Sequence, residues 1–269
     1  MRNWVLIVFL GAAAAAGQAQ TASNPRNVSL TSIFGNQLAL TLAAQDTVNV
    51  SNTYYFPHMA FGGGWQTTLT YVNYSPQVVN CNTTFRGNDG SLVSPPFSAP
   101  IPTQLAPGAS FHIETQAAGG EIDAWAQAGC DGPIKPSLLY RLYNGATAVG
   151  EAGVNATATP TTEFVTYAQS LTGIALANPQ VQPANVTVNV LNSAGSLIFT
   201  TSFVLNPSAH FSNLISGLSG APANFTGSVQ ILSPGVPIVA LSLNAEKFPS
   251  FSSLPPGDLP DGTPLATGH

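Results

Sequence analysis

The chain has 269 residues, of which 6% are charged and 44% are hydrophobic, and its formal net charge is −5. Soluble proteins average about 25% charged residues, so the surface of this protein must consist largely of uncharged polar side chains. The six lysines and arginines form no basic cluster, which argues against nucleic acid and anionic membranes as partners. The hydrophobic content argues against disorder, although the chain has 25 glycines and 22 prolines.

Residues 1–19 have the pattern of a secretory signal peptide. Arg2 supplies a positive start, residues 4–16 form an apolar run, and Gly17 and Ala19 offer the small side chains of a cleavage site. The rival interpretation is a membrane anchor, but the apolar run is shorter than the ~20 residues that a spanning helix needs. We therefore expect a secreted, cell-surface or periplasmic protein, with no membrane insertion once the signal is removed.

The next segment, residues 20–53, contains two short alternating stretches at residues 37–42 and 47–50. Alternation of apolar and polar residues is typical of a strand with one buried face. Two interpretations remain open: the segment adds edge strands to the first sandwich, or it is a flexible stalk.

Alternating patterns dominate the rest of the chain, and helical periodicity is almost absent. In the first half, similar side chains, apolar or polar, recur at every second position in three stretches, which predicts β-strands. These stretches are residues 65–71, 81–85 and 111–113. Residues 88–90, Asn-Asp-Gly, are typical of a hairpin turn, because glycine accepts the positive φ that tight turns require. The fold class predicted from these patterns is all-β.

The same pattern occurs twice. At an offset of 105, Asn73, Gln77, Asn80 and Gly90 align with Asn178, Gln182, Asn185 and Gly195, and at an offset of 100, Leu105, Pro107 and Phe111 align with Leu205, Pro207 and Phe211. Ordered identities at turns and strands indicate a duplicated module. Short strands at about ten-residue spacing then predict two tandem immunoglobulin-like β-sandwich domains.

We expect the first sandwich at residues 54–153, a linker at residues 154–161 and the second sandwich at residues 162–253. Residues 254–269 are predicted to form a flexible tail.

Cys81 and Cys130 are the two cysteines of the chain. In an oxidising compartment, such a pair favours a disulfide over a metal or catalytic site. Closing a loop of about fifty residues contributes roughly 3 to 4 kcal/mol in the chain-entropy model. We predict a bridge confined to the first module, because the aligned residues of the second are Val186 and Ser233.

Three stretches resemble a group of exported bacterial β-sandwich proteins of uncharacterised function, which carry tandem immunoglobulin- or fibronectin-like repeats. They are residues 55–69 (YFPHMAFGGGWQTTL), residues 105–108 (LAPG) and residues 125–127 (WAQ). The second copy retains residues 173–179 (GIALANP) but lacks the Gly-Gly-Gly-Trp segment. The resemblance covers most of the chain after the signal peptide and implies no reaction.

Known enzyme motifs are missing: no nucleophile elbow, zinc-protease, phosphate-loop or dinucleotide-binding pattern occurs in the sequence. His112 and Glu114 share a strand face and suggest metal ligands, but the second copy has no acid beside His210, so polar strand residues are the favoured interpretation. We expect no catalytic residues, metal or cofactor.

Glu121, Asp123 and Asp131 form the densest acidic group. Carboxylates on one strand face suit a calcium loop or an acid–base pair. A glycine pair at residues 119–120 precedes them and favours the simpler interpretation, in which they solvate a turn.

Tyr54, Tyr55 and Trp65 are the candidate ligand or interface residues. Exposed tyrosine and tryptophan supply large contact area at small entropic cost and stack on sugar rings. The structural alternative is that Trp65 and the phenylalanines of residues 54–65 fill the core, while residues 62–64, all glycine, let the chain cross between sheets.

Three functions follow. The first is a non-catalytic secreted or cell-surface protein with a structural, adhesion or scaffolding role and with surface proteins or glycans as partners. The alternative is a carbohydrate-binding protein that uses exposed aromatics of the first domain. A hydrolase with an unrecognised site is the third, because sandwiches host many unrelated activities.

Overall fold

The computed structural model describes residues 26–31, 37–42, 48–93, 100–247, 249–254 and 257–258. The predicted signal peptide and residues 259–269 of the predicted tail lie outside them. Within the described residues the protein is all-β, as predicted, and its only helical element is the short 3-10 helix η1 (Ile215–Gly217). None of the described elements is a helix long and apolar enough to cross a membrane.

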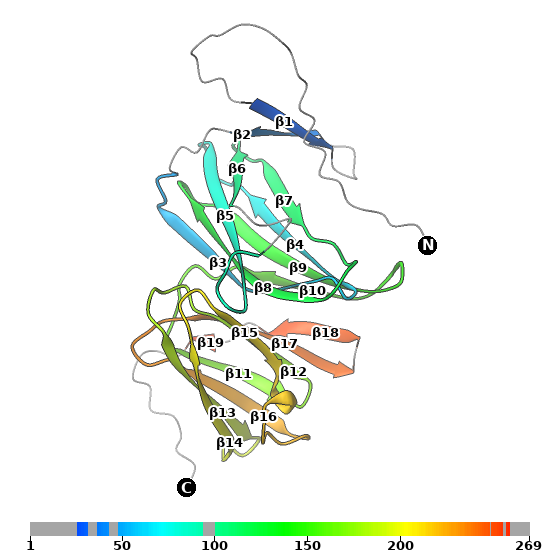
Figure 1. Ribbon diagram of the computed structural model, residues 1–269, viewed down its shortest axis with the longest axis vertical. Helices are drawn as coiled ribbons and strands as arrows, with labels where there is room; N and C mark the ends of the chain where they lie inside the picture. Colours follow the sequence, from blue (N-terminus) through cyan, green and yellow to red (C-terminus); the bar gives the residue numbers. More distant parts are fainter. Residues whose placement is uncertain are drawn as a thin grey trace, which may run out of the picture.

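The N-terminal segment forms an antiparallel hairpin of β1 (Arg26–Thr31) and β2 (Gln37–Leu42), in which Arg26 pairs with Leu42 and Thr31 with Gln37. The hairpin is a separate two-stranded sheet, and β2 lies against β6 of the first half (Figure 1). The first alternating stretch of the sequence thus coincides with β2, whereas residues 48–50 form no strand.

The first half contains eight strands: β3 (Asn52–Phe61), β4 (Trp65–Val72), β5 (Val79–Gly87), β6 (Ile101–Leu105), β7 (Ser110–Glu114), β8 (Ile122–Cys130), β9 (Lys135–Asn144) and β10 (Thr147–Asn155). They form two antiparallel sheets with the orders β3-β8-β5-β6 and β10-β9-β4-β7. Alternate side chains of both sheets meet in one core. The Tyr71 hydroxyl lies 2.8 Å from Thr83 Oγ1 and links the two sheets, so this buried phenol is paired.

The second half contains nine strands: β11 (Glu163–Gln169), β12 (Thr172–Ala177), β13 (Ala184–Asn192), β14 (Leu197–Leu205), β15 (His210–Leu214), β16 (Thr226–Leu232), β17 (Val239–Lys247), β18 (Ser250–Leu254) and β19 (Gly257–Asp258). Their sheet orders are β14-β13-β16-β11-β19 and β15-β12-β17-β18. A second core lies between them, rich in valine on β13 and β16. β19 falls within the predicted tail and pairs with β11.

The two halves repeat each other strand for strand. If β3 is matched with β11 and each later strand with its successor, both sheet orders coincide, and only β19 is left over. Equivalent asparagines make equivalent bonds: Asn73 Nδ2 donates to the carbonyls of Gln77, Leu105 and Ala106, and Asn178 Nδ2 donates to those of Gln182, Leu205 and Asn206. The alignment made from the sequence therefore pairs residues that occupy equivalent places.

The predicted disulfide is present. Cys81 on β5 lies directly opposite Cys130 on β8, and both residues are buried in the first core. In the second half, Val186 and Ser233 are also fully buried, so a valine and a serine occupy the positions that the alignment pairs with the bridge.

Candidate functional site at the junction of the two halves

The three candidate aromatics do not form one surface. Tyr54 is half-buried, and its hydroxyl accepts a hydrogen bond from the Ile134 amide at 3.0 Å. Tyr55 points the other way, as the alternation of a strand requires, and packs on Trp125 where the two halves meet. Trp65 is half-buried against the first core, with its ring centroid 5.2 Å from that of Phe251 of the second half.

The glycine run beside Trp65 carries the chain from one sheet to the other. This crossing is the structural role that was predicted as the alternative to a ligand site. Gly62, Gly63 and Gly64 all have positive φ, between 60° and 98°. A Cβ at Gly62 would lie 2.0 Å from the Gly120 carbonyl oxygen, so no larger residue fits there.

The three residues of the predicted acidic group lie at opposite ends of β8. Asp131 lies past the end of the strand, where its carboxylate accepts two 2.7 Å bonds from Asn80. Glu121 and Asp123 lie at the start, and Ser212 Oγ of the second half donates to Asp123 Oδ2 at 3.0 Å. Burial, together with the charge of Asp123, raises the pKa of Glu121.

The other suggested metal ligands are engaged elsewhere. Glu114 accepts a 3.3 Å bond from Thr68 and lies 4.0 Å from Arg141, whose main partner is Glu151 at 2.7 Å. Across the described ranges, no three histidine, cysteine, aspartate or glutamate side chains are grouped closely enough to hold a metal ion.

Two histidines that the sequence patterns did not single out as a site meet at the centre of the junction. His58 Nδ1 on β3 lies 3.2 Å from His210 Nε2 on β15, and the rings are nearly parallel at 15°. His210 Nδ1 lies 2.7 Å from Oδ1 of Asn88, which belongs to the hairpin turn of the first half. The Tyr140 hydroxyl donates to the His58 carbonyl at 2.7 Å and fixes the backbone behind it.

One sequence signal could have drawn attention to His58. Pro57 precedes it inside a strand, and proline within a sheet is confined to edges and bulges. The register of β3 against β8 does shift between Phe56 and Met59. No comparable signal marks His210.

Two further contacts hold the halves together. The indole N–H of the buried Trp125 donates to the carbonyl of Ser208 at 2.7 Å. Gly90 packs so closely on the turn of the second half that a Cβ would lie 2.8 Å from the Pro207 carbonyl oxygen. The predicted hairpin turn at residues 88–90 is therefore also a docking element.

A cleft of about 350 Å³ opens beside the histidine pair. Polar groups from both halves line it, together with apolar residues of β12, β15 and β17; the polar and aromatic members are His58, Trp65, Glu121, Asp123, Ser212 and Asn213. Its size and its mixture of an apolar wall with a few polar groups are typical of small-molecule sites. The described residues of its lining include two acids and no lysine or arginine, which makes this part of the cleft unsuited to anions.

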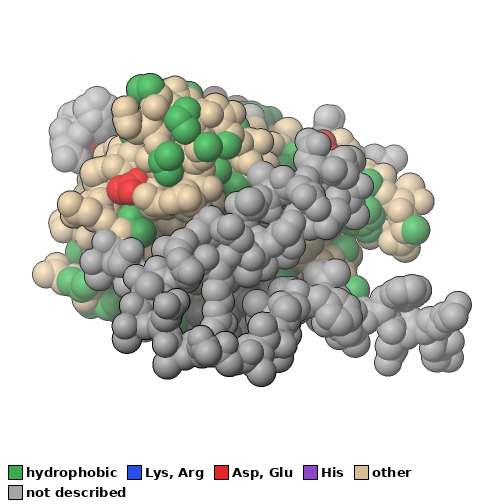
Figure 2. All heavy atoms as spheres, turned by 90° about the horizontal axis from the view of Figure 1, so that it is seen from above, with side chains coloured by type: hydrophobic (Ala, Val, Ile, Leu, Met, Phe, Trp, Pro, Cys, Tyr) green, Lys and Arg blue, Asp and Glu red, His purple; other side chains and the backbone are tan. Residues whose placement is uncertain are grey.

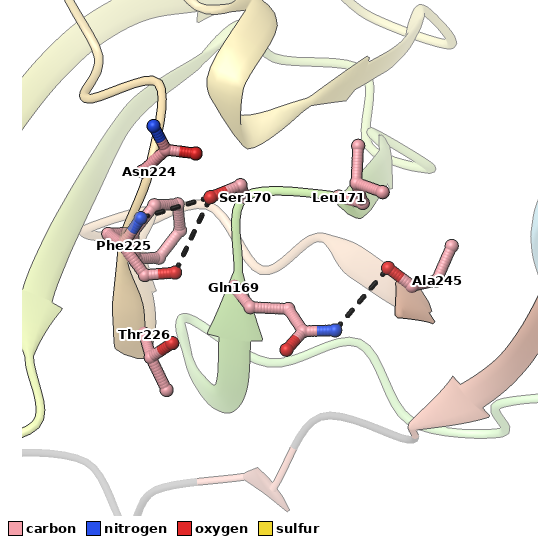
Figure 3. Close-up of a pocket in the computed structure, with 7 residues that line it drawn as sticks. All are labelled: Gln169, Ser170, Leu171, Asn224, Phe225, Thr226 and Ala245. Carbon is pink, nitrogen blue, oxygen red and sulfur yellow. Dashed lines mark hydrogen bonds between the residues drawn. The ribbon is translucent and has the colours of Figure 1, made fainter. Parts of the chain in front are cut away.

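A larger hollow of about 560 Å³ lies in the second half, where loops meet the ends of β11, β16 and β17 (Figure 3). Gln169 Nε2 donates to the Ala245 carbonyl at 3.3 Å, and Ser170 Oγ accepts from the Phe225 amide at 3.0 Å. None of the described residues that line it has a titratable side chain, and the polar groups just named hold the loops.

The described part of the surface seen from above is mostly uncharged, with scattered hydrophobic side chains and few acidic ones (Figure 2). This agrees with the low charge of the sequence.

The fold and junction thus define an all-β protein in which two sandwich-like pairs of sheets dock through a buried polar contact. No family model matches the chain, and no match is found among curated proteins. A solved structure, the crystal structure of Thermotoga maritima 1070, is similar at 14% identity over 42% of this chain and 97% of that chain, with a TM-score of 0.32. Structural similarity at that level carries no inference about this chain.

Proposed function

We propose that this chain is a non-catalytic exported protein in which two tandem immunoglobulin-like domains form one rigid unit with a structural, adhesion or scaffolding role. The disulfide supports export, because such bonds persist in oxidising compartments. The observation that carries the proposal is the junction itself, where buried polar groups join the halves instead of facing a substrate.

The strand order supports the immunoglobulin-like assignment. In both halves the second strand pairs with the fifth and the third with the sixth, which are the central pairings of an immunoglobulin sandwich. The outer strands differ: β3 and β11 pair with the sixth strand, while β9 and β17 pair with the second. Each half is therefore a variant in which the first and seventh strands exchange sheets.

Carbohydrate binding is the second candidate function. Trp65 lines the junction cleft together with two carboxylates and Asn213. An aromatic face beside hydrogen-bonding oxygens is the arrangement that a sugar ring requires. Tyr54 and Tyr55 are not among the residues that line the cleft, so Trp65 is the one candidate aromatic that carries this function.

One screen tests both candidates. The mature protein is offered ester, glycoside and peptide substrates and is applied to a glycan array. The structural proposal expects no turnover and no glycan binding that depends on Trp65. Turnover that falls at least tenfold in Asp123→Asn but not in Glu151→Gln would overturn it, because Glu151 is an acid outside the cleft.

Glycan binding that is lost in Trp65→Ala and kept in Tyr74→Ala would favour carbohydrate binding, because Tyr74 is an exposed aromatic residue elsewhere on the surface.

A further inference from the structure

His58 and His210 are 152 residues apart, and each half supplies one of them. His210 is 4% exposed, and the ring centroids are 5.2 Å apart. We propose that this pair is a pH-sensitive clasp, which holds the two halves together while both rings are neutral and weakens their docking when the rings gain protons.

The hydrogen bonds fit two neutral rings. If His210 donates through Nδ1 to Asn88 Oδ1, its Nε2 is an acceptor and receives the Nδ1 hydrogen of His58. A doubly protonated pair would bring two N–H groups face to face at 3.2 Å. The bond between the rings is therefore lost when His210 Nε2 gains a proton, and a proton on His58 leaves a positive charge in a buried place.

Few charged groups face the pair to offset a positive charge. Asp123 on β8 is the carboxylate whose charge favours protonated His58, and Glu121 lines the same cleft. Tyr140 on β9 and Tyr71 on β4 are buried phenols that stay neutral. Besides His210, the strands β12 and β15 and the described side chains of β17 contribute no titratable group.

The direction of the effect follows from burial. Burial lowers the pKa of His58 from 6.5 to about 4, although the charge of Asp123 opposes it. Burial, helped by His58, also holds the pKa of His210 well below 6.5, although a backbone hydrogen bond with Pro57 opposes it. When the halves separate, both rings are exposed to water and bind protons more readily. Docking therefore weakens as the pH falls from about 6.5 towards 4. For His58 alone, docking should be roughly 20-fold weaker at pH 5 than at pH 7.

Hydrogen exchange of the Trp125 indole N–H measures docking directly, because its acceptor Ser208 lies across the junction. We expect its protection factor in the full chain, corrected for intrinsic exchange, to fall at least about 20-fold between pH 7 and pH 5. The amide of Cys81, inside the first core, should keep its protection. In the double variant His58→Asn with His210→Asn, which has no titratable ring at the clasp, the fall should be less than threefold.

His112→Asn is the matched control, since His112 lies on β7 and takes no part in the clasp; it should behave as the wild type. Indole protection in the wild type that changes less than threefold would overturn the clasp, whether or not the variants fold. A fall of about 20-fold or more that persists in the folded double variant would overturn it as well.

Discussion

Ser208 shows how one backbone conformation can serve the junction. Among the described residues it is the only non-glycine with a positive φ, at 60°. The aligned residue of the first half is Gly108, with a φ of 73°. A side chain in this left-handed region costs about 1–2 kcal/mol. The same turn presents the carbonyl that accepts the Trp125 indole, so a strained residue takes part in docking.

Replacing Trp125 by phenylalanine should therefore destabilise the protein by about 1–3 kcal/mol, because it leaves the Ser208 carbonyl buried without its donor. Denaturant unfolding followed by circular dichroism measures the loss. Ser208→Gly is the control, because it keeps the carbonyl and relieves the strain, and its stability should change by less than about 1 kcal/mol. Equal losses in both variants would contradict this role of the indole bond.

At the scale of strands, period-two patterns predicted the elements well but not their sheets. The stretches at residues 65–71, 81–85 and 111–113 all lie within strands, namely β4, β5 and β7. Alternation identifies a buried face, but it does not say which neighbour a strand pairs with. The sheets to which the first and seventh strands of each half belong therefore could not be foreseen.

The site was predicted less well than the fold. Asp131 was grouped with Asp123 because they are near in sequence, yet eight residues of extended chain separate them by about 25 Å. Conversely, His58 and His210 meet only because the two halves dock, and local patterns carry no information about docking. Trp65, predicted as a candidate ligand or interface residue, lines the cleft, but its contact with Phe251 could not be foreseen.

The β5–β8 pair is the element on which the disulfide acts. Replacing the bridge by the residues of the second half, in the double variant Cys81→Val with Cys130→Ser, should cost about 3 kcal/mol, because the unfolded chain regains its loop entropy. Calorimetry should show a lower unfolding midpoint. Reducing agent should shift the wild type in the same direction and leave the variant unchanged. An unchanged midpoint in the variant would show that the bridge adds no stability.

At the scale of the whole molecule, the two cores are distinct but in contact. Leu241 of β17 is buried in the first core, and Leu243 and Phe251 pack against it. β18 lies beside β10, where Ser253 Oγ donates to the Gly153 carbonyl at 2.5 Å (Figure 1). The linker is fixed as well, since Thr157 pairs with Tyr55 and Thr161 with Ile238. The second half thus completes part of the first core.

Because the halves share this apolar contact, we expect the wild type to unfold in a single calorimetric transition at pH 7. Phe251→Ala should separate it into two, with a loss of about 1–3 kcal/mol, since the half-buried ring covers Trp65 and contacts Gly150. Phe199→Ala removes a partly buried ring that packs only within the second core, so it should lower stability without separating the transitions. Two transitions in the wild type, or the same profile for both variants, would show that the halves fold independently and that docking adds little cooperativity.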